Sequence, residues 1–240
     1  MIEFLIRLLQ RIVVCLSDLV IAVNEDLATL SRGVGAKHVV VVEPYVDLRK
    51  FLPATKPPIG GQFRVMYVGR LEPEKGILDL LAVARILALE NIEFVVAGGG
   101  SLALALNLAV RSQPELSRVR LLGPVDHETM PELYHQADVV VLPSYTEGAP
   151  VAVFEAMASG CPVIATRVGN LPTLFRNEVD IMFADTADPE DLARKVRMLF
   201  VDDILRERLM KNARLKTREL FGSYIEAHIR LYSRLTRSAS

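Results

Sequence analysis

The sequence predicts an α/β protein in which a Rossmann-like, doubly wound parallel sheet follows a smaller α/β segment at the N-terminus. From residue 63 onward, short apolar runs alternate with longer amphipathic stretches, which is the order of parallel βαβ units. Before residue 53 the same alternation supplies only two apolar runs. We therefore expect one large sheet and one small accessory unit.

The N-terminal segment has the pattern of two helices and two strands. The expected elements are a helix over 1–16, a strand over 19–23, a helix from residue 25 and a strand over 39–42. Asn24 is suited to cap the second helix, because its side-chain oxygen can accept a hydrogen bond from a backbone amide. Two parallel strands and two helices cannot cover both faces of a sheet, whereas parallel sheets are normally buried on both. We expect another domain or chain to complete this unit.

The proline and glycine residues of 53–62 indicate a linker and place a domain boundary near residue 50. Beyond it, six apolar runs are short enough to be buried strands, and helical patterns separate or follow them. The expected strands are 63–68, 92–97, 119–122, 138–142, 162–166 and 180–183. The expected helices are 76–89, 102–111, 130–136, 150–159, 189–200, 204–220 and 223–235. The last three have no strand between them, and we expect them to cover the sheet and lead back toward the N-terminal part.

Composition restricts the classes of function. The chain has 240 residues, and its 28 Lys and Arg residues are balanced by 29 Asp and Glu residues. Because the net charge is only −1, we do not expect binding to nucleic acid, and any phosphate site must be local. Cys15 and Cys161 lack the spacing of a metal site or a redox pair, which favours a reducing, cytoplasmic location and no metal. The charges within residues 1–16 argue against a membrane span, and no cleavage site of a secretory signal follows.

Two carboxylates eight residues apart mark the candidate site. Glu147 falls in a loop predicted after the strand 138–142, and Glu155 falls in the helix that Pro150, at the first helical position, is expected to open. Ligands of open α/β sheets bind beyond the carboxyl ends of the strands, and the amides at a helix start attract phosphate. Carboxylates beside a phosphate site suggest a ligand with sugar hydroxyls.

The run from Glu147 to Val163 closely resembles the E-x7-E motif of retaining, nucleotide-sugar-dependent glycosyltransferases with the GT-B fold, including its E-A-M-A-x-G-x-P-V continuation. The run from Gly69 to Gly76 resembles the Gly-Arg-Leu and Lys-Gly motif of the same family. Residues 17–23 look like the end of the family's N-terminal domain. The resemblance implies the C-terminal half of a GT-B fold of the group 1 or family 4 type, with most of the N-terminal domain absent.

In that family the C-terminal domain binds the nucleotide-sugar donor and the N-terminal domain binds the acceptor. The resemblance therefore implies three parts of the chain. They are an acceptor-side remnant over 1–50, a nucleotide-sugar-binding domain over 51–222, and a C-terminal helix over 223–240 that wraps back toward the N-terminal part.

The resemblance also assigns the site residues. Glu147 would face the donor sugar as the catalytic residue, and Glu155 would accept hydrogen bonds from the ribose hydroxyls. Arg70 and Lys75 would bind the diphosphate, the first through its planar guanidinium and the second as a point charge. The remaining contacts would come from Gly98, Gly99, Val125, Gly148, Ala149, Pro150 and Val151.

Simpler interpretations stay open for several of these residues. Arg70 and Lys75 could be solvated surface cations, and the two glutamates a loop and a helix-surface carboxylate. The glycines at 98 and 99 permit close approach of backbone to a ligand, but a tight turn without a ligand explains them equally well. A glycosidase pair of acid and nucleophile is disfavoured, because nothing places both carboxylates across one bond. His127 is given no catalytic role.

The implied function is hexosyl transfer, with retention, from a UDP- or GDP-sugar to an unknown glycan, lipid or small-molecule acceptor. No metal and no cofactor other than the donor is expected. A partner chain or a second copy would have to supply the acceptor domain. The alternatives are a non-catalytic nucleotide-sugar-binding subunit or pseudoenzyme, and a nucleotide-sugar epimerase. The first helix and the basic C-terminal region allow at most weak peripheral contact with the inner face of a membrane.

Overall fold

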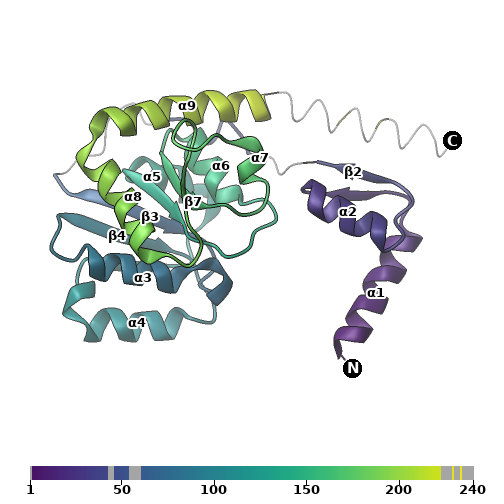
Figure 1. Ribbon diagram of the computed structural model, residues 1–240, viewed down its shortest axis with the longest axis horizontal. Helices are drawn as coiled ribbons and strands as arrows, with labels where there is room; N and C mark the ends of the chain where they lie inside the picture. The colour runs from purple at the N-terminus through teal and green to yellow at the C-terminus, as the bar shows by residue number, and fades with distance from the viewer. Residues whose placement is uncertain (1, 43–45, 54–60, 223–228, 230–232, 234–240) are drawn as a thin grey trace.

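A six-stranded parallel sheet flanked by helices forms the larger part of the molecule, and a separate two-stranded parallel sheet lies near the N-terminus. The computed structural model describes residues 2–42, 46–53, 61–222, 229 and 233. Figure 1 shows the two parts side by side, with helix α9 running along one edge of the larger part. The predicted fold class, a Rossmann-like doubly wound sheet with a small N-terminal α/β unit, is confirmed.

All six predicted strands of the large sheet are present. They are β3 (Phe63–Val68), β4 (Ile92–Ala97), β5 (Val119–Gly123), β6 (Val139–Leu142), β7 (Val163–Thr166) and β8 (Met182–Ala184). Their order across the sheet is β5-β4-β3-β6-β7-β8, and every neighbouring pair is parallel. After β3 the chain adds β4 and β5 on one side of that strand. It then crosses to the other side, where β6 pairs with β3 and is followed by β7 and β8. The topological switch point of the sheet therefore lies between these two strands.

The helices of the larger part also follow the predicted order. They are α3 (Ile77–Ile86), α4 (Ala103–Ser112), α5 (Met130–His135), α6 (Val151–Ala158), α8 (Pro189–Val201) and α9 (Asp203–Phe221). Four short elements were not predicted, because a single turn is too short to show helical periodicity. They are α7 (Leu171–Leu174) and the 3-10 turns η1 (Pro73–Lys75), η2 (Pro114–Leu116) and η3 (His127–Thr129).

The predicted role of Pro150 as the first residue of its helix is wrong by one position. Pro150 is not the first helical residue of α6 but its N-cap, since its ψ of 94° is extended and the helix begins at Val151. The fixed φ of proline suits both positions, so φ alone could not distinguish them. The helix predicted over 223–235 and the wrapping segment 223–240 lie outside the described residues, apart from Ile229 and Ser233. Most of the predicted linker, residues 54–60, also lies outside them.

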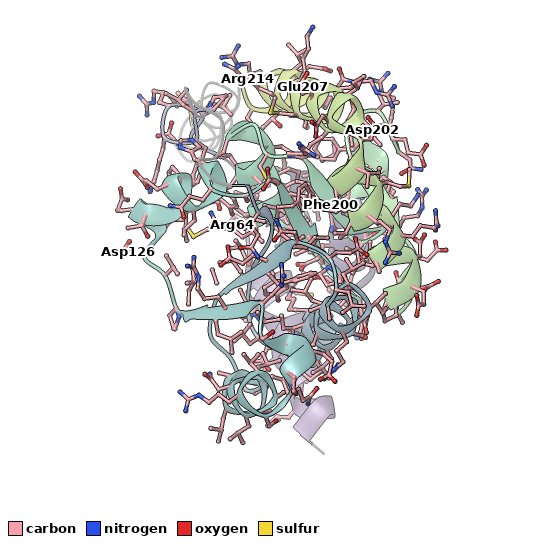
Figure 2. The ribbon with its side chains drawn as sticks, turned by 90° about the vertical axis from the view of Figure 1, so that its left-hand side faces the viewer. Arg64, Asp126, Phe200, Asp202, Glu207 and Arg214 are labelled. Atoms are coloured by element: carbon pink, nitrogen blue, oxygen red, sulfur yellow. The ribbon has the colours of Figure 1, made fainter. Side chains whose placement is uncertain are left out.

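Two apolar layers cover the faces of the large sheet. Along β3, the side chains of Val65 and Tyr67 join one core, which includes α3 and α8, while Met66 joins the other, which includes α5 and α6. This alternation is what a strand buried on both faces requires. In Figure 2, Asp126 at the start of η3 lies on one side of the sheet and Phe200 of α8 lies on the other.

The small N-terminal unit consists of α1 (Ile2–Leu16), β1 (Val20–Ala22), α2 (Glu25–Gly33) and β2 (Val39–Val41). The two strands are parallel, as predicted. Asn24 caps α2, because its side-chain oxygen accepts a hydrogen bond from the amide of Leu27 at 2.8 Å. The same side chain donates to the carbonyl oxygen of Gly148 at 2.7 Å. The small unit therefore contacts the loop that carries Glu147.

Helix α1 presents a row of exposed apolar side chains. Val13 is 64% exposed and Leu16 is 79% exposed, and the row follows one helical face. Its described members are Leu5, Leu8, Leu9, Ile12, Val13 and Leu16. In the part of the chain that the structure describes, no helix is both long and apolar enough to cross a membrane. The small unit thus leaves apolar surface uncovered, as its incomplete sheet predicts.

The segment 46–53, which leads out of the small unit, packs against the large sheet. Val46 and Phe51 are almost fully buried, and both belong to the apolar core that contains α5 and α6. Between Val46 and Phe51 in the sequence, the carboxylate of Asp47 accepts a hydrogen bond from the amide of Arg49 at 3.0 Å. The boundary near residue 50 stays a prediction, but these side chains already contribute to the core of the larger part.

Glycine determines how the loops meet at the carboxyl edge of the sheet. The amide of Leu71 donates to the carbonyl oxygen of Gly99 at 2.9 Å, which joins the loop after β3 to the loop after β4. Gly98 has a φ of +148°, and a Cβ atom there would lie 1.8 Å from the carbonyl oxygen of Gly69. At Gly99 the nearest contact of a Cβ atom would be 3.1 Å from the ring of Pro124. A side chain at Gly98 would therefore clash with backbone, which cannot move aside, whereas one at Gly99 would only press on a proline ring.

We expect Gly98→Ala to lower the free energy of unfolding by more than about 2 kcal/mol, because it combines backbone strain with a clash between two loops. Gly99→Ala is the matched control, and its cost should stay below about 1 kcal/mol, since a proline ring can shift slightly. Urea denaturation followed by circular dichroism measures both values. Equal stability of the two variants would show that the loops do not meet as described.

Candidate functional site

The two motif-bearing loops meet at the switch point of the sheet. The loop after β3 leads to Lys75, and the loop after β6 leads to Glu147. The amide of Tyr145 in the second loop donates to the carbonyl oxygen of Glu74 in the first at 2.8 Å. Gly76 has a φ of +65°, and a Cβ atom there would lie 1.9 Å from the carbonyl oxygen of Pro143. Glycine at this position therefore allows the two loops to touch.

Lys75 and Glu147 form an ion pair at the centre of this contact. The Lys75 Nζ lies 2.8 Å from Glu147 Oε2, and the two side chains are only 15% and 12% exposed. Ser144 Oγ donates to the other carboxylate oxygen of Glu147 at 2.8 Å. The carbonyl of Ser144 in turn accepts a hydrogen bond from Thr166 Oγ1 at the end of β7. Lys75 and Glu147 are therefore not solvated surface charges, which was the simpler interpretation of the sequence pattern.

Arg70 is held differently from Lys75. Its side chain is 65% exposed and pairs with Glu74 at 3.0 Å, whereas its carbonyl oxygen accepts a hydrogen bond from Tyr67 Oη at 2.7 Å. Burial and the nearby charge of Glu147 raise the pKa of Tyr67 well above its ordinary value, so the phenol keeps its proton and remains a donor. The backbone of Arg70 is thus fixed. Its guanidinium can leave Glu74 for an anionic ligand at little cost, since exposed ion pairs contribute little.

Glu155 is buried within α6, and its side chain is 8% exposed. Tyr134 Oη donates to Oε2 at 2.9 Å, and His127 Nε2 lies 2.7 Å from Oε1. Burial, the charge of Glu155 and this hydrogen bond raise the pKa of Tyr134 well above its ordinary value. The interpretation of Glu155 as a solvated helix-surface glutamate is therefore wrong. A carboxylate has about four acceptor positions, so two hydrogen bonds from the protein leave further positions for a ligand.

The start of α6 offers backbone donors beside Glu147. Within the described residues, the amides of Ala149 and Val151 donate no hydrogen bond to the protein. The carbonyl oxygen of Gly148 already accepts a hydrogen bond from the side chain of Asn24. Gly169, in the loop after β7, has a φ of +58° and approaches the same carbonyl, with a Cβ position 2.7 Å away. Free amides at a helix start are a suitable environment for an anion.

The glycines after β4 are explained by packing between loops. The amide of Gly98 donates to the carbonyl oxygen of Gly123 at 2.8 Å, and both Gly98 and Gly99 approach neighbouring loops closely. Val125 is half-buried and packs against the core that includes Tyr134. The structure thus supplies a reason for the glycines that needs no ligand. Ligand contacts of Gly98, Gly99 and Val125 stay predictions.

Sequence reasoning missed His127 and Tyr134 as partners of Glu155. Tyr134 has the spacing of an apolar core position on α5, and nothing in the sequence distinguishes its hydroxyl as a donor. His127 occupies a 3-10 turn that has no sequence periodicity. Asn24 was recognised as a helix cap, but its second hydrogen bond, to a residue 124 positions away, had no sequence signal. Within the described residues, no group of three or more His, Cys, Asp or Glu side chains could hold a metal ion.

The mutual dependence of Lys75 and Glu147 is measurable. We expect Lys75→Met and Glu147→Gln each to destabilise the fold, because each leaves a mostly buried partner unpaired, and the double variant to lose less than their sum. A coupling energy of about 1–3 kcal/mol in a double-mutant cycle by urea denaturation is expected. The exposed pair Arg70 and Glu74 is the control and should couple by less than about 0.5 kcal/mol. Additive effects at the first pair would contradict the contact.

Comparisons with known proteins identify chains that are similar to this one. A curated relative, D-inositol 3-phosphate glycosyltransferase from Salinispora arenicola, is 34% identical over 206 residues, which are 74% of this chain and 45% of the relative. Sucrose-phosphate synthase from Thermosynechococcus elongatus matches 98% of this chain and 62% of its own with a TM-score of 0.85 and 28% identity. Anabaena HepE, solved in complex with UDP-glucose, matches 99% of this chain and 70% of its own with a TM-score of 0.83; at 20% identity it shows the fold alone.

The chain spans about half the length of the curated relatives it matches. The model of the family described as glycosyl transferases group 1 matches residues 49–216, which include both motif-bearing loops and the six strands of the large sheet. The implied GT-B architecture is thereby confirmed at the level of the family. The chain belongs to the group 1 glycosyl transferases.

Proposed function

We propose that this chain is the donor-binding part of a retaining glycosyltransferase that uses a nucleoside-diphosphate sugar. The observation that carries the proposal is the meeting of Lys75, Glu147 and the start of α6 at the switch point of the sheet. A cation, a carboxylate and free backbone amides there match a ligand that has both phosphate and hydroxyl groups. Relatives named as glycosyltransferases support the class of reaction.

The diphosphate of the donor would bind Lys75, Arg70 and the amides near Val151. Lys75 has three donor hydrogens and spends one on Glu147, which leaves two for phosphate oxygens. Lys75 and the amides are in place before the reaction, and the guanidinium of Arg70 would turn to the ligand from Glu74. Together they would stabilise the charge that develops on the diphosphate leaving group. A metal ion is not needed in this scheme, because the protein supplies the positive charge.

Glu147 would face the donor sugar, with Gly148, Ala149 and Pro150 beside it, and Glu155 would bind the ribose hydroxyls. The base would lie near Val125 and contact backbone groups, with Gly98 and Gly99 facing the donor. UDP- and GDP-sugars are both candidates. Uridine is the first to test, because Anabaena HepE was solved with UDP-glucose.

The acceptor side would depend on a second unit. The apolar row on α1 and the two-stranded sheet of the small unit have surface left to cover. A partner chain, a second copy or further sequence of an acceptor-binding domain would cover it and bind the glycan, lipid or small-molecule acceptor. A reducing, cytoplasmic location accords with two free cysteines, of which Cys161 is buried.

Donor binding is tested by calorimetric titration with UDP, GDP and ADP and their sugars. We expect at least one nucleotide to bind, and Lys75→Ala and Glu155→Ala to weaken that binding by about tenfold or more, as expected when a charge-assisted contact is lost. Lys211→Ala is the control for loss of a lysine charge, since Lys211 lies exposed on α9. Failure of every nucleotide to bind would refute the proposal.

Product analysis separates transfer from the two alternatives. With a donor that binds, we expect no change of the sugar in the absence of acceptor, and transfer only when an acceptor-binding unit is supplied. Appearance of an epimeric nucleotide-sugar without acceptor would identify an epimerase. Binding without any turnover, even with acceptor domains from relatives present, would identify a non-catalytic subunit. Robust transfer by this chain alone would show that no second unit is needed.

A further inference from the structure

Glu155 is held by two donors that come from outside its own helix. His127 belongs to η3 and Tyr134 to α5, and they bond opposite oxygens of the carboxylate at 2.7 and 2.9 Å. Tyr134 is buried, whereas the side chain of His127 is 62% exposed. One donor is therefore fixed by the core. The other is largely exposed and contacts Lys50 and Phe51.

Lys50 determines which nitrogen of His127 carries the proton. The Lys50 ammonium lies 3.1 Å from His127 Nδ1 and 2.8 Å from Glu128 Oε1. An ammonium group can only donate, so Nδ1 must be the acceptor in this contact. The proton of the neutral imidazole is then on Nε2, where it is donated to Glu155. Three side chains thus form a directed chain of hydrogen bonds from Lys50 to the carboxylate.

Phe51 packs against both donors of Glu155. Its ring lies 5.5 Å from the ring of His127 and 6.0 Å from the ring of Tyr134, with interplanar angles of 60° and 61°. The same segment is anchored where His135 Nε2 contacts the carbonyl oxygen of Leu52 at 2.5 Å. Phe51 is only 2% exposed, so the position of the segment 50–52 and the position of both donors are linked by close packing.

We propose that His127 and Tyr134 are positioning residues that orient Glu155 toward the ribose diol of the donor, and that Lys50 and Phe51 hold His127 in the required tautomer and place. The proposal rests on the proposed function, because it assumes a nucleotide at the site. Two donors on the protein side restrict rotation of the carboxylate and leave acceptor positions for two vicinal hydroxyls. Glu155 would bind the diol more weakly if either donor were lost, since the carboxylate could then turn away.

The test compares a nucleoside diphosphate with its 2′,3′-dideoxy analogue, which lacks the diol. For the wild-type chain we expect the dideoxy analogue to bind about tenfold or more weakly. In His127→Phe the ratio of the two dissociation constants, dideoxy analogue over ribose form, should fall to about twofold. The affinity for the dideoxy analogue itself should change little. His127→Gln keeps a donor near the position of Nε2 and should restore most of the ratio. His38→Phe, a histidine of the small unit outside this network, is the control.

The affinity for the dideoxy analogue also reports whether each variant is folded. A His127→Phe variant that keeps the wild-type ratio would overturn the positioning role. Equal losses for both nucleotides would overturn it too, because that result indicates a general structural defect. If the wild-type chain binds a diphosphate without preferring the ribose form, the role of Glu155 fails while the donor site stands. If it binds no nucleotide at all, the proposed function itself fails, and the positioning role falls with it.

The tautomer has a spectroscopic signature of its own. In the chain labelled with 15N-histidine, we expect the nuclear magnetic resonance signals of His127 to show a protonated Nε2 and an unprotonated Nδ1. Lys50→Met removes the donor to Nδ1 and should shift these signals toward a mixture of tautomers. A protonated Nδ1 in the wild-type chain at neutral pH would refute the hydrogen-bond chain from Lys50.

Discussion

The position of β6 beside β3 is the constraint on which the candidate site depends. The strands are paired through Val65 with Val139 and Met66 with Val140, although β4, β5 and three helices lie between them in the chain. Since the sheet is parallel, the loops that follow both strands emerge at the same edge. Lys75 and Glu147 are 72 positions apart in sequence and meet only because of this pairing. Gly76 completes the contact, because any side chain there would displace the loop of Pro143.

The electrostatics of the site follow from that contact. Lys75 and Glu147 neutralise each other in a mostly buried place, where an unpaired charge would be costly. A diphosphate that arrives at Lys75 would share the ammonium with Glu147, so Glu147 would remain close to the phosphates and the sugar attached to them. Glu155 lies in a separate environment, in which the hydroxyl of Tyr134 and the imidazole of His127 contact its carboxylate. Glu147 and Glu155 are therefore not equivalent, because the first is paired with a cation and the second is held by hydrogen bonds.

Local patterns in the sequence predicted the elements and their order, because buried strands and amphipathic helices leave a clear apolar periodicity. Family resemblance predicted that Arg70, Lys75 and the two glutamates share a site, and the structure brings Lys75 and Glu147 into contact. It could not predict the partners of Glu155, since a tyrosine at a core spacing does not reveal where its hydroxyl points. The start of α6 was misplaced at Pro150, because ψ depends on the loop that precedes the helix. One-turn elements such as η3 were also beyond prediction.

The N-terminal part of the chain reaches the surroundings of both carboxylates by independent routes. Asn24 of the small unit donates to Gly148, next to Glu147, and the segment 50–52 packs on the two donors of Glu155. A neutral hydrogen bond contributes about 1 kcal/mol, and a coupling of that size changes an affinity by about fivefold. Loss of either contact would therefore change the surroundings of one carboxylate of the proposed donor site. By reciprocity, a bound donor would favour the arrangement in which both contacts are made. The N-terminal segment thus contributes contacts on both sides of the proposed donor site, although its small unit has only two helices and two strands.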